Sequence, residues 1–447
     1  MQQAIIASSI FVVVYFLIIA GRRRFHIPIW VSMVIGAVLM LALQVISVQS
    51  ALKSINLDVI GFLFGMFSIV TALDKSGVIK LVAVKMLSRA NNIDSILLIF
   101  VVGMGMLSAF LVNDTVALIA VPLIIYISRQ IGIRSVVLFI SLAFGISIGS
   151  TFTPIGNPQN LLIALQSGIS LPFTTFIIHL TIPTLINLFL TYFILRLYFK
   201  KDLVMLNSAK YDSITDGPHK VILPSSSIDR GQPVIENMYL AKISSTILLI
   251  TIAGFVISEF LRFFHIANIG LSTVALLGAG VLYLVSGSNN ERKEILRGVD
   301  YSVLVFFAAM FVVMSALWSS GVISMIMSHF PSPDPSNIIQ SNTVISAVSL
   351  LLSQILSNVP FVAIYNLVML NNGFIVGDAH VNQWMMLASA STIAGNLTIL
   401  GAASNIIIIN AAESRGSTAF MYAEFFKIGA IITIVNISVY YLFLTYL

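Results

Sequence analysis

The stretch STFTPIGNPQNLLIAL, residues 150–165, interrupts a chain that is apolar on both sides of it. Pro154 and Pro158 each lack a backbone N–H donor, and the glycine between them adds backbone freedom, so a regular helix cannot continue through this stretch. We therefore predict one helix that ends near Thr153 and a second helix that begins near Asn160.

The composition indicates that this break lies within a membrane. The chain has 447 residues, of which 58% are hydrophobic and 9% are charged, whereas a soluble domain carries about 25% charged residues. Apolar runs of about 20 residues recur from end to end, which predicts a polytopic α-helical membrane protein. The first run, residues 4–20, lacks a basic n-region before it and a small-residue cleavage site, so it is interpreted as a retained helix and not as a signal peptide. The chain has no cysteine, which excludes disulfides and thiolate chemistry.

A break at membrane depth needs a physical reason. Each unpaired backbone N–H or C=O group costs several kcal/mol in hydrocarbon, so such breaks survive where they line a cavity or are buried in protein. The N-termini of the resulting half-helices attract anions, and their C-termini and free carbonyls attract cations. We therefore interpret the break as part of a binding site; a simple kink for packing is the alternative.

The break occurs twice in the chain. LVNDTVALIAVP, residues 111–122, pairs with LSNVPFVAIYN, residues 356–366, and IGNPQNLLIAL, residues 155–165, pairs with LGAASNIIIIN, residues 400–410. In each pair the shared asparagine or glycine recurs 245 residues later without a gap. The chain is therefore predicted to contain an internal repeat of two similar halves.

The repeat gives a domain organisation. We expect a first membrane half over residues 1–198, a cytoplasmic linker over 199–240, and a second half over 241–447. Each half is predicted to have five full crossings, a re-entrant hairpin (95–127 and 342–371) and an unwound helix (134–167 and 383–412). An odd number of crossings inverts the second half, and inverted repeats with broken helices are typical of secondary transporters.

The basic residues predict the orientation. Most Lys and Arg residues, including those at 22–24, 129–134 and 199–242, can be placed on one side of the membrane. The positive-inside rule makes that side cytoplasmic and therefore puts both termini on the outer side of the membrane. The membrane itself is expected to be the plasma or inner membrane of the cell. The net charge of +6 is thus attributed to orientation in a lipid bilayer, and no nucleic-acid partner is expected.

Each predicted half has two polar interruptions, the tip of its hairpin and the loop of its unwound helix. The polar residues of these four interruptions are the candidate ligands. The substrate-binding candidates are Asn113, Thr115, Thr151, Thr153, Asn157, Asn160, Ser357, Asn358, Asn396, Thr398, Ser404 and Asn405. The candidates for a coupling ion are Asp114, Asn113, Gly156, Asn358 and Gly401. Asp114 is either a proton or cation carrier or a cap of the hairpin tip. The six histidines lack metal-ligand spacing, so no resident metal is expected.

Four motifs resemble those of the ion transporter superfamily, and most of all those of its arsenical-pump and anion-permease branch. They are VNDTVALIAVP, GSTFTPIGNPQN, LSNVP and AGNLTILGAASN. The superfamily also groups bacterial sodium–proton antiporters and sodium-coupled dicarboxylate symporters. The resemblance implies paired hairpins and unwound helices around the substrate, an elevator-like movement of that core, and in some members a homodimer. It also implies that Asn113 and Asn358 are hairpin-tip asparagines and that Asn160 and Asn405 belong to the unwound loops.

These observations predict an ion-coupled secondary transporter and not an enzyme. No Lys or Arg is placed in the core, which favours a neutral hydroxide such as arsenous acid or a small inorganic anion. A sodium–proton antiporter that uses Asp114 is the second hypothesis, and an anion channel is the third. No cofactor is expected beyond coupling Na⁺ or H⁺. The chain has no phosphate-binding motif, so ATP drive would require a separate soluble ATPase subunit, which nothing in the sequence indicates.

Overall fold

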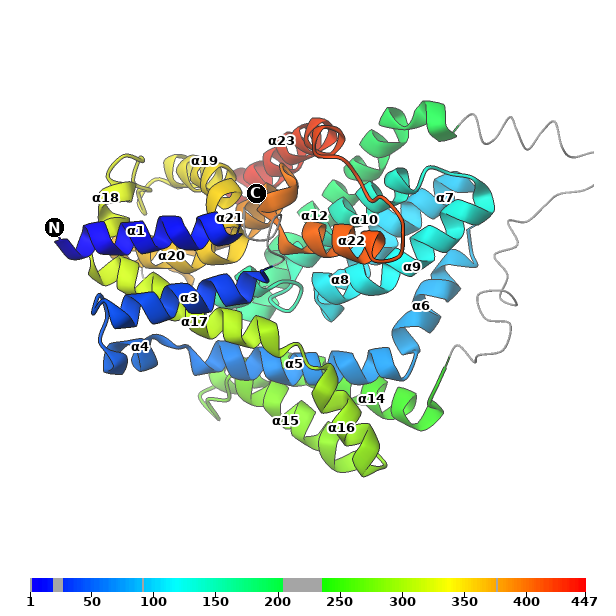
Figure 1. Cartoon of the computed structure of the whole chain (residues 1–447), viewed down its shortest axis with the longest axis horizontal. Helices are drawn as coiled ribbons and strands as arrows, with labels where there is room; N and C mark the ends of the chain where they lie inside the picture. Colours follow the sequence, from blue (N-terminus) through cyan, green and yellow to red (C-terminus); the bar gives the residue numbers. More distant parts are fainter. Residues whose placement is uncertain (1, 19–26, 91, 204–234, 375–376) are drawn as a thin grey trace, which may run out of the picture.

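The computed structural model describes residues 2–18, 27–90, 92–203, 235–374 and 377–447, which are predominantly helical and contain no strand (Figure 1). Nine of the described helices are long and apolar enough to cross a membrane. The predicted all-α membrane architecture is confirmed. Arginines 22–24 and most of the predicted linker lie outside the described residues.

Thirteen helical elements are assigned among the described residues of the first half. They are α1 (Gln2–Phe16), α3 (Ile29–Ala42), α4 (Val48–Ser54), α5 (Leu57–Lys75), α6 (Val78–Leu87), α7 (Ile93–Leu98), the π-helical turn η2 (Ile99–Gly103), α8 (Met104–Leu111), α9 (Asn113–Ile131), α10 (Ser135–Gly149), the 3₁₀ turn η3 (Ser150–Phe152), α11 (Pro158–Gln166) and α12 (Pro172–Tyr198).

The second half follows the same order. Its elements are α14 (Met238–Phe263), α15 (Leu271–Val285), α16 (Asn289–Gly298), α17 (Tyr301–Ser319), α18 (Val322–Met327), α19 (Ile338–Leu356), α20 (Asn358–Asn371), η4 (Asp378–His380), α21 (Val381–Ala394), η5 (Ile399–Gly401), α22 (Ala403–Glu413) and α23 (Tyr422–Tyr446).

Asparagines begin several of these helices. The side chains of Asn56, Asn92, Asn237 and Asn337 each accept a hydrogen bond from the backbone N–H three residues later. These caps satisfy donors that the first turn of a helix leaves unpaired, and each is worth about 1 kcal/mol. At these four helices the capping asparagine thus marks where the helix begins.

Unusual backbone angles recur at equivalent places in the two halves. Val112 and Ser357, the residues between the two arms of each hairpin, have φ values of 65° and 63°. Gly77 and Gly321, which precede α6 and α18, have φ values of 85° and 79°. A positive φ is rare outside glycine, so its recurrence at Val112 and Ser357 indicates that the two hairpins turn in the same way.

The halves also exchange packing partners. α3 of the first half packs on α17, and its counterpart α15 packs on α5. In the same way α9 packs on α22, and α20 packs on α11. This reciprocity is what a two-fold relation between the halves requires, whereas their inverted orientation in a membrane stays a prediction.

The contacts separate two bodies. We call α1, α3, α4, α5 and α14–α17 the frame, and α7–α12 with α19–α23 the core, because the extensive helix contacts lie within each group. α6 and α18 connect them along the chain. In Figure 1 the frame helices α5, α15 and α16 lie along the lower edge, and α10, α12 and α23 lie above them.

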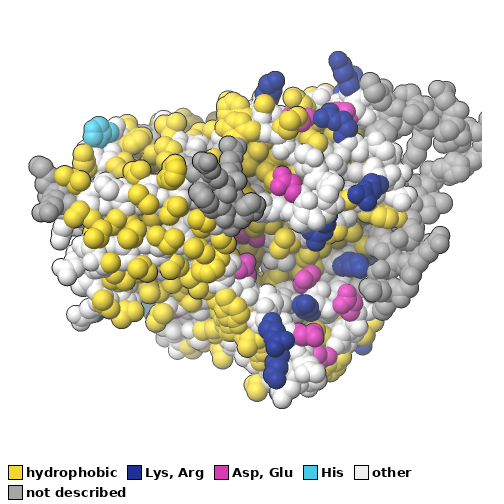
Figure 2. Space-filling view, viewed as in Figure 1, with side chains coloured by type: hydrophobic (Ala, Val, Ile, Leu, Met, Phe, Trp, Pro, Cys, Tyr) yellow, Lys and Arg dark blue, Asp and Glu magenta, His cyan; other side chains and the backbone are white. Residues whose placement is uncertain are grey.

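The surface is divided by charge. Figure 2 shows Lys and Arg side chains on the right half of the visible face, and a largely apolar surface on the left half. This asymmetry agrees with the charge pattern in the sequence.

Each arm of the first hairpin, Ile93–Leu111 and Asn113–Ile131, is long enough to cross a membrane, so a re-entrant path for this hairpin remains a prediction.

Candidate functional site

The first break lies close to the place that the sequence predicts. α10 ends at Gly149, a single 3₁₀ turn reaches Phe152, and α11 begins at Pro158 with the Asn157 side chain as its cap. A Cβ on Gly156 would lie 2.3 Å from the carbonyl oxygen of Ser150. Only glycine therefore allows the loop to fold back against the end of α10.

One asparagine holds this loop together. The amide nitrogen of Asn160 donates to three carbonyl oxygens, those of Ser150 at 3.2 Å, Thr151 at 2.9 Å and Thr153 at 3.1 Å. Carbonyls at a helix C-terminus have no partner within the helix, and leaving one unpaired in a buried place costs about 1–3 kcal/mol. Asn160 thus stabilises the unwound conformation from inside.

The first hairpin tip is joined to the same loop. The backbone N–H of Asn113, at the start of α9, donates to the carbonyl of Gly156 at 3.0 Å. The Thr153 hydroxyl accepts from the N–H of Gly156 at 3.0 Å and donates to the carbonyl of Ala109. The loop and the tip therefore form one hydrogen-bonded unit.

The second break repeats the clamp with different chemistry around it. The amide nitrogen of Asn405 donates to the carbonyl of Gly395 at 2.9 Å and to that of Thr398 at 3.5 Å. Here the Thr398 hydroxyl donates at 2.7 Å to the side chain of Gln354, which in turn donates at 2.8 Å to the carbonyl of Ala394. A glutamine side chain thus replaces the backbone contact made by Ala109.

The two breaks meet at Ser147 and Thr392. Ser147 donates to the carbonyl of Thr392 at 3.4 Å, and the two residues are 245 positions apart, so they are equivalent positions of the two halves. A contact between positions 245 residues apart is what a two-fold relation between the predicted repeats would produce. The Thr392 hydroxyl also lies 3.4 Å from the side-chain nitrogens of Asn157 and Gln159. Sequence reasoning missed Ser147, Gln159 and Thr392.

Several buried polar atoms of the breaks and of the hairpin tips have no hydrogen-bond partner among the described residues. Both tip asparagines, Asn113 and Asn358, are less than a tenth exposed, and each has a side-chain oxygen that accepts no hydrogen bond. The second break adds both side-chain polar atoms of Asn396, the hydroxyl of Ser404 and the side-chain oxygen of Asn405. Buried oxygens without donors are suited to a bound cation or to the hydroxyls of a solute.

Three further predicted residues lie at the hairpin tips and are half-buried. Thr115 and Asp114 occupy the first turn of α9, and Ser357 is the turn residue before α20. Within the described parts of the chain no salt bridge to Asp114 is found. The carboxylate of Asp300, which caps α17, is near enough for its charge to act on Asp114. A carboxylate in a helix first turn is favourable for the helix dipole, which leaves the cap interpretation open.

A buried polar seam extends from the first break between α12 and α23. The Tyr440 hydroxyl lies 2.6 Å from that of Thr184 and also beside Thr151 in the unwound loop. Asn187 donates to the carbonyl of Asn436 at 3.1 Å. All of these side chains are fully buried, so the polar groups of the loop continue into the helix pair that flanks it.

Glu259 is a buried carboxylate that sequence reasoning did not select. It lies on α14 of the frame, is 1% exposed, and accepts from the backbone N–H groups of Phe173 and Thr174 and from the Thr174 hydroxyl. It therefore caps the N-terminus of α12, which belongs to the core. Its position near the end of an apolar run was the available signal.

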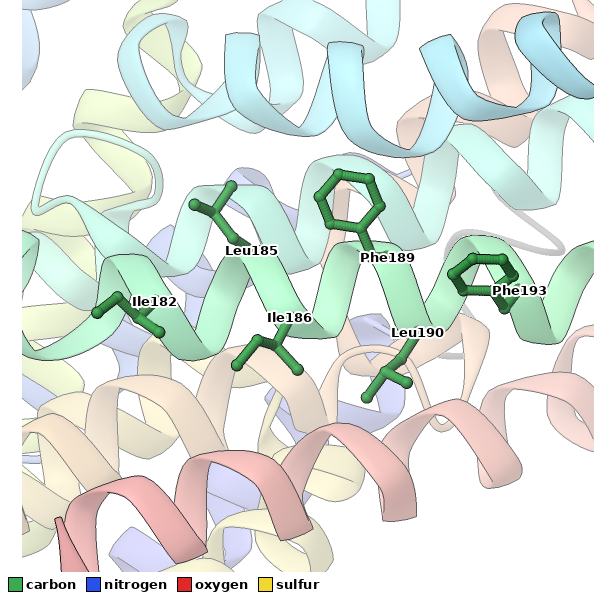
Figure 3. Close-up of a pocket in the computed structure, with 6 residues that line it drawn as sticks. All are labelled: Ile182, Leu185, Ile186, Phe189, Leu190 and Phe193. Carbon is green, nitrogen blue, oxygen red and sulfur yellow. The ribbon is translucent and has the colours of Figure 1, made fainter.

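The surface pocket on α12 is not part of this site. It has a volume of about 400 Å³ and an apolar lining, shown in Figure 3: Ile182, Leu185, Ile186, Phe189, Leu190 and Phe193. Such a lining offers nothing to a polar solute. Within the described residues no group of three His, Asp or Glu side chains could hold a metal ion.

The helical fold, the apolar surface and the buried polar breaks define a multi-pass membrane transporter. Residues 14–384 match the family model described as "Citrate transporter" (CitMHS), and the chain belongs to that family. The transporter class expected from the sequence motifs is thereby confirmed, and the protein is a transporter rather than an enzyme.

Similar proteins agree with this class. An uncharacterized transporter of Mycobacterium tuberculosis (strain H37Rv) is 29% identical over 453 residues, which cover 99% of each chain. The silicon efflux transporter of rice is 26% identical over 86% of this chain and 85% of its own. The human P protein is 26% identical over 88% of this chain and 54% of its own length.

Proposed function

We propose that this protein is an ion-coupled secondary transporter of a small inorganic anion or an arsenite-like, hydroxyl-rich solute. The observation that carries the proposal is the set of buried, uncharged polar atoms at the two breaks and the two hairpin tips that have no partner among the described residues, above all the side-chain oxygens of Asn113 and Asn358. These groups can exchange hydrogen bonds with a hydroxylated solute, and their oxygens can also coordinate a cation.

The absence of a cationic side chain supports a solute of low charge. Among the described residues, no Lys or Arg side chain is buried. A trianion would have to rely on helix N-termini and co-bound cations, whereas a neutral hydroxide needs only hydrogen bonds. The rice relative is named for efflux of silicon. That name supports a neutral polyhydroxyl solute, since arsenous and silicic acids share that chemistry.

The coupling ion is proposed to be Na⁺ or H⁺. The side-chain oxygens of Asn113 and Asn358 and the carbonyls around Gly156 and Gly401 are the candidate Na⁺ ligands. Asn160 and Asn405 are assigned to holding the loops, because their amide groups already bond loop carbonyls. Alternating access would take place by an elevator-like movement of the core against the frame, with both termini outside the cell.

A sodium–proton antiporter is the second candidate. It is favoured by Asp114, a half-buried carboxylate at the first tip for which the described residues supply no salt bridge. Val359 stands at the equivalent position of the second tip, so the two tips would differ in proton chemistry. An anion channel is the third candidate, and it would conduct without concentrating a solute.

A flux assay in proteoliposomes tests the proposal. Arsenite, silicic acid, citrate and small monovalent anions are offered while Na⁺ and H⁺ gradients are imposed separately. Uphill movement of a hydroxylated solute under one gradient supports the proposal and identifies the ion. Sodium–proton exchange with every solute inert would support the antiporter instead.

The tip assignment has its own test. Asn113→Ala and Asn358→Ala should each reduce transport more than tenfold while leaving membrane insertion and elution as a single species unchanged, because each removes one ligand oxygen from a buried site. The matched control is Asn372→Ala, whose side chain caps the end of α20 away from the tip through the Val368 carbonyl. Normal uptake by both tip variants would refute the assignment.

A further inference from the structure

Tyr15 reaches from the frame to the second hairpin tip. Its hydroxyl donates to the carbonyl oxygen of Leu356 at 2.8 Å, across 341 positions of sequence. Leu356 is the last residue of α19, and Ser357 and Asn358 follow it directly. The Tyr15 side chain is buried, and its ring lies 4.6 Å from that of Phe11 on the same helix.

This hydrogen bond satisfies a carbonyl that the helix cannot satisfy. The last carbonyls of a helix have no intrahelical partner, and burial makes an unpaired carbonyl costly. At Leu356 the chain turns into Ser357, whose φ of 63° is unfavourable for a serine. The tyrosine therefore stabilises the turn from which Asn358 points its unpartnered oxygen.

The first tip is held differently. There the N–H of Asn113 donates to the carbonyl of Gly156, and both groups belong to the core. No described side chain of α14, the helix equivalent to α1, bonds the carbonyl of Leu111, the residue equivalent to Leu356. The first tip would therefore travel with the core, whereas the second tip is tied to the frame.

We propose that Tyr15 is a positioning residue that fixes the second tip, and with it Asn358, as long as core and frame keep the arrangement seen here. The inference rests on the proposed function, because it takes Asn358 to be a ligand. When the core moves against the frame, the bond between Tyr15 and Leu356 breaks and the second tip is released, while the first tip keeps its own bond.

The test uses Tyr15→Phe, which removes one oxygen and keeps the ring. The natural chain has no cysteine, so Ser357→Cys gives a single thiol at the tip whose reaction with a water-soluble maleimide reports exposure. In the purified full-length protein, Tyr15→Phe should raise the labelling rate about two- to tenfold, the factor expected for one lost hydrogen bond.

Tyr283→Phe is the matched control. The Tyr283 hydroxyl donates to Ser68 at 3.1 Å, and both residues lie within the frame. This variant loses an equivalent hydrogen bond away from the tip, and it should leave the labelling rate unchanged. An equal rise in both variants would mean general loosening and would overturn the proposal.

Transport gives the second readout, measured without the cysteine. Tyr15→Phe should raise KM about two- to tenfold with less effect on the maximal rate, because ligand geometry is altered and no ligand is removed. Unchanged labelling together with unchanged KM would overturn the proposal. If no solute is moved by any variant, the proposed function fails, but the labelling comparison still decides the role of Tyr15.

Discussion

The two breaks share one clamp and differ in what surrounds it. In both, an asparagine amide, from Asn160 or Asn405, bonds the carbonyls left by the unwound helix. The loop of the first break is then held by backbone groups and short side chains, and Gly156 packs directly against the backbone of Ser150. The second is closed by the long side chain of Gln354 and retains more unpartnered polar atoms.

This difference suggests that the two halves have divided their tasks. Close glycine contacts occur at both breaks: a Cβ on Gly149 would lie 2.1 Å from the carbonyl oxygen of Gly105, and a Cβ on Gly429 would lie 2.1 Å from that of Asn396. The loops differ in their own glycines, because a Cβ at 156 would lie 2.3 Å from the Ser150 carbonyl oxygen, whereas a Cβ at 401 has no atom nearer than 3.0 Å. Among the described residues, the second break also retains the unpartnered side chains of Asn396 and Ser404. We infer that the first break mainly sets geometry and that the second contributes more of the solute contacts.

The largest expected contrast is between Gly156→Ala and Gly401→Ala. The new Cβ at 156 would lie 2.3 Å from the carbonyl oxygen of Ser150, whereas at 401 the nearest atom, Cα of Gly395, is 3.0 Å away. Overpacking against rigid backbone costs about 3 kcal/mol or more, and a contact that needs only a small shift costs about 1 kcal/mol. Gly156→Ala should abolish transport and lower the thermal midpoint by several degrees.

The measurement is thermal unfolding in detergent combined with flux in proteoliposomes. Gly401→Ala is the internal control, because it makes the same chemical change at the equivalent position. If the two variants behave alike, the first break is no more rigid than the second, and the division of tasks inferred above is wrong.

The next contrast is between Asn160→Ala and Asn405→Ala. Asn160 bonds three carbonyls between 2.9 and 3.2 Å, and Asn405 bonds two, one of them at 3.5 Å. Removing either amide leaves buried carbonyls unpaired, so we expect losses of about 2–4 kcal/mol for Asn160→Ala and about 1–2 kcal/mol for Asn405→Ala. Thermal midpoints of the two purified variants test the order, and the reverse order would contradict the clamp comparison.

The sequence was sufficient for the parts of this comparison that depend on local chemistry. Both breaks could be located from Pro154, Pro158 and the recurring asparagines. Prolines and polar residues inside an apolar run are seldom compatible with a continuous membrane helix. It could not show that the amide of Asn160 turns inward to the loop carbonyls, because either end of an amide can face a ligand. Tyr15, Gln354 and Thr392 were missed because each acts through a residue distant in sequence or through a helix packed beside it.

The smallest contrast concerns the one position where the tips differ in charge, Asp114 in the first and Val359 in the second. Asp114→Asn keeps the size of the side chain and its place in the first turn of α9, but removes the group that can take up a proton. If Asp114 carries the coupling proton, transport by the variant should vary less than about twofold between pH 5.5 and 8 while the parent varies more, as expected when the titrating group is removed. The measurement is initial flux across that pH range, with Asp300→Asn as the comparison, because Asp300 is a carboxylate of the frame that caps α17 and is near enough for its charge to act on Asp114. A variant at 114 that keeps the parental pH profile would leave Asp114 as a helix-terminal charge, and both tips would then work through their asparagines alone.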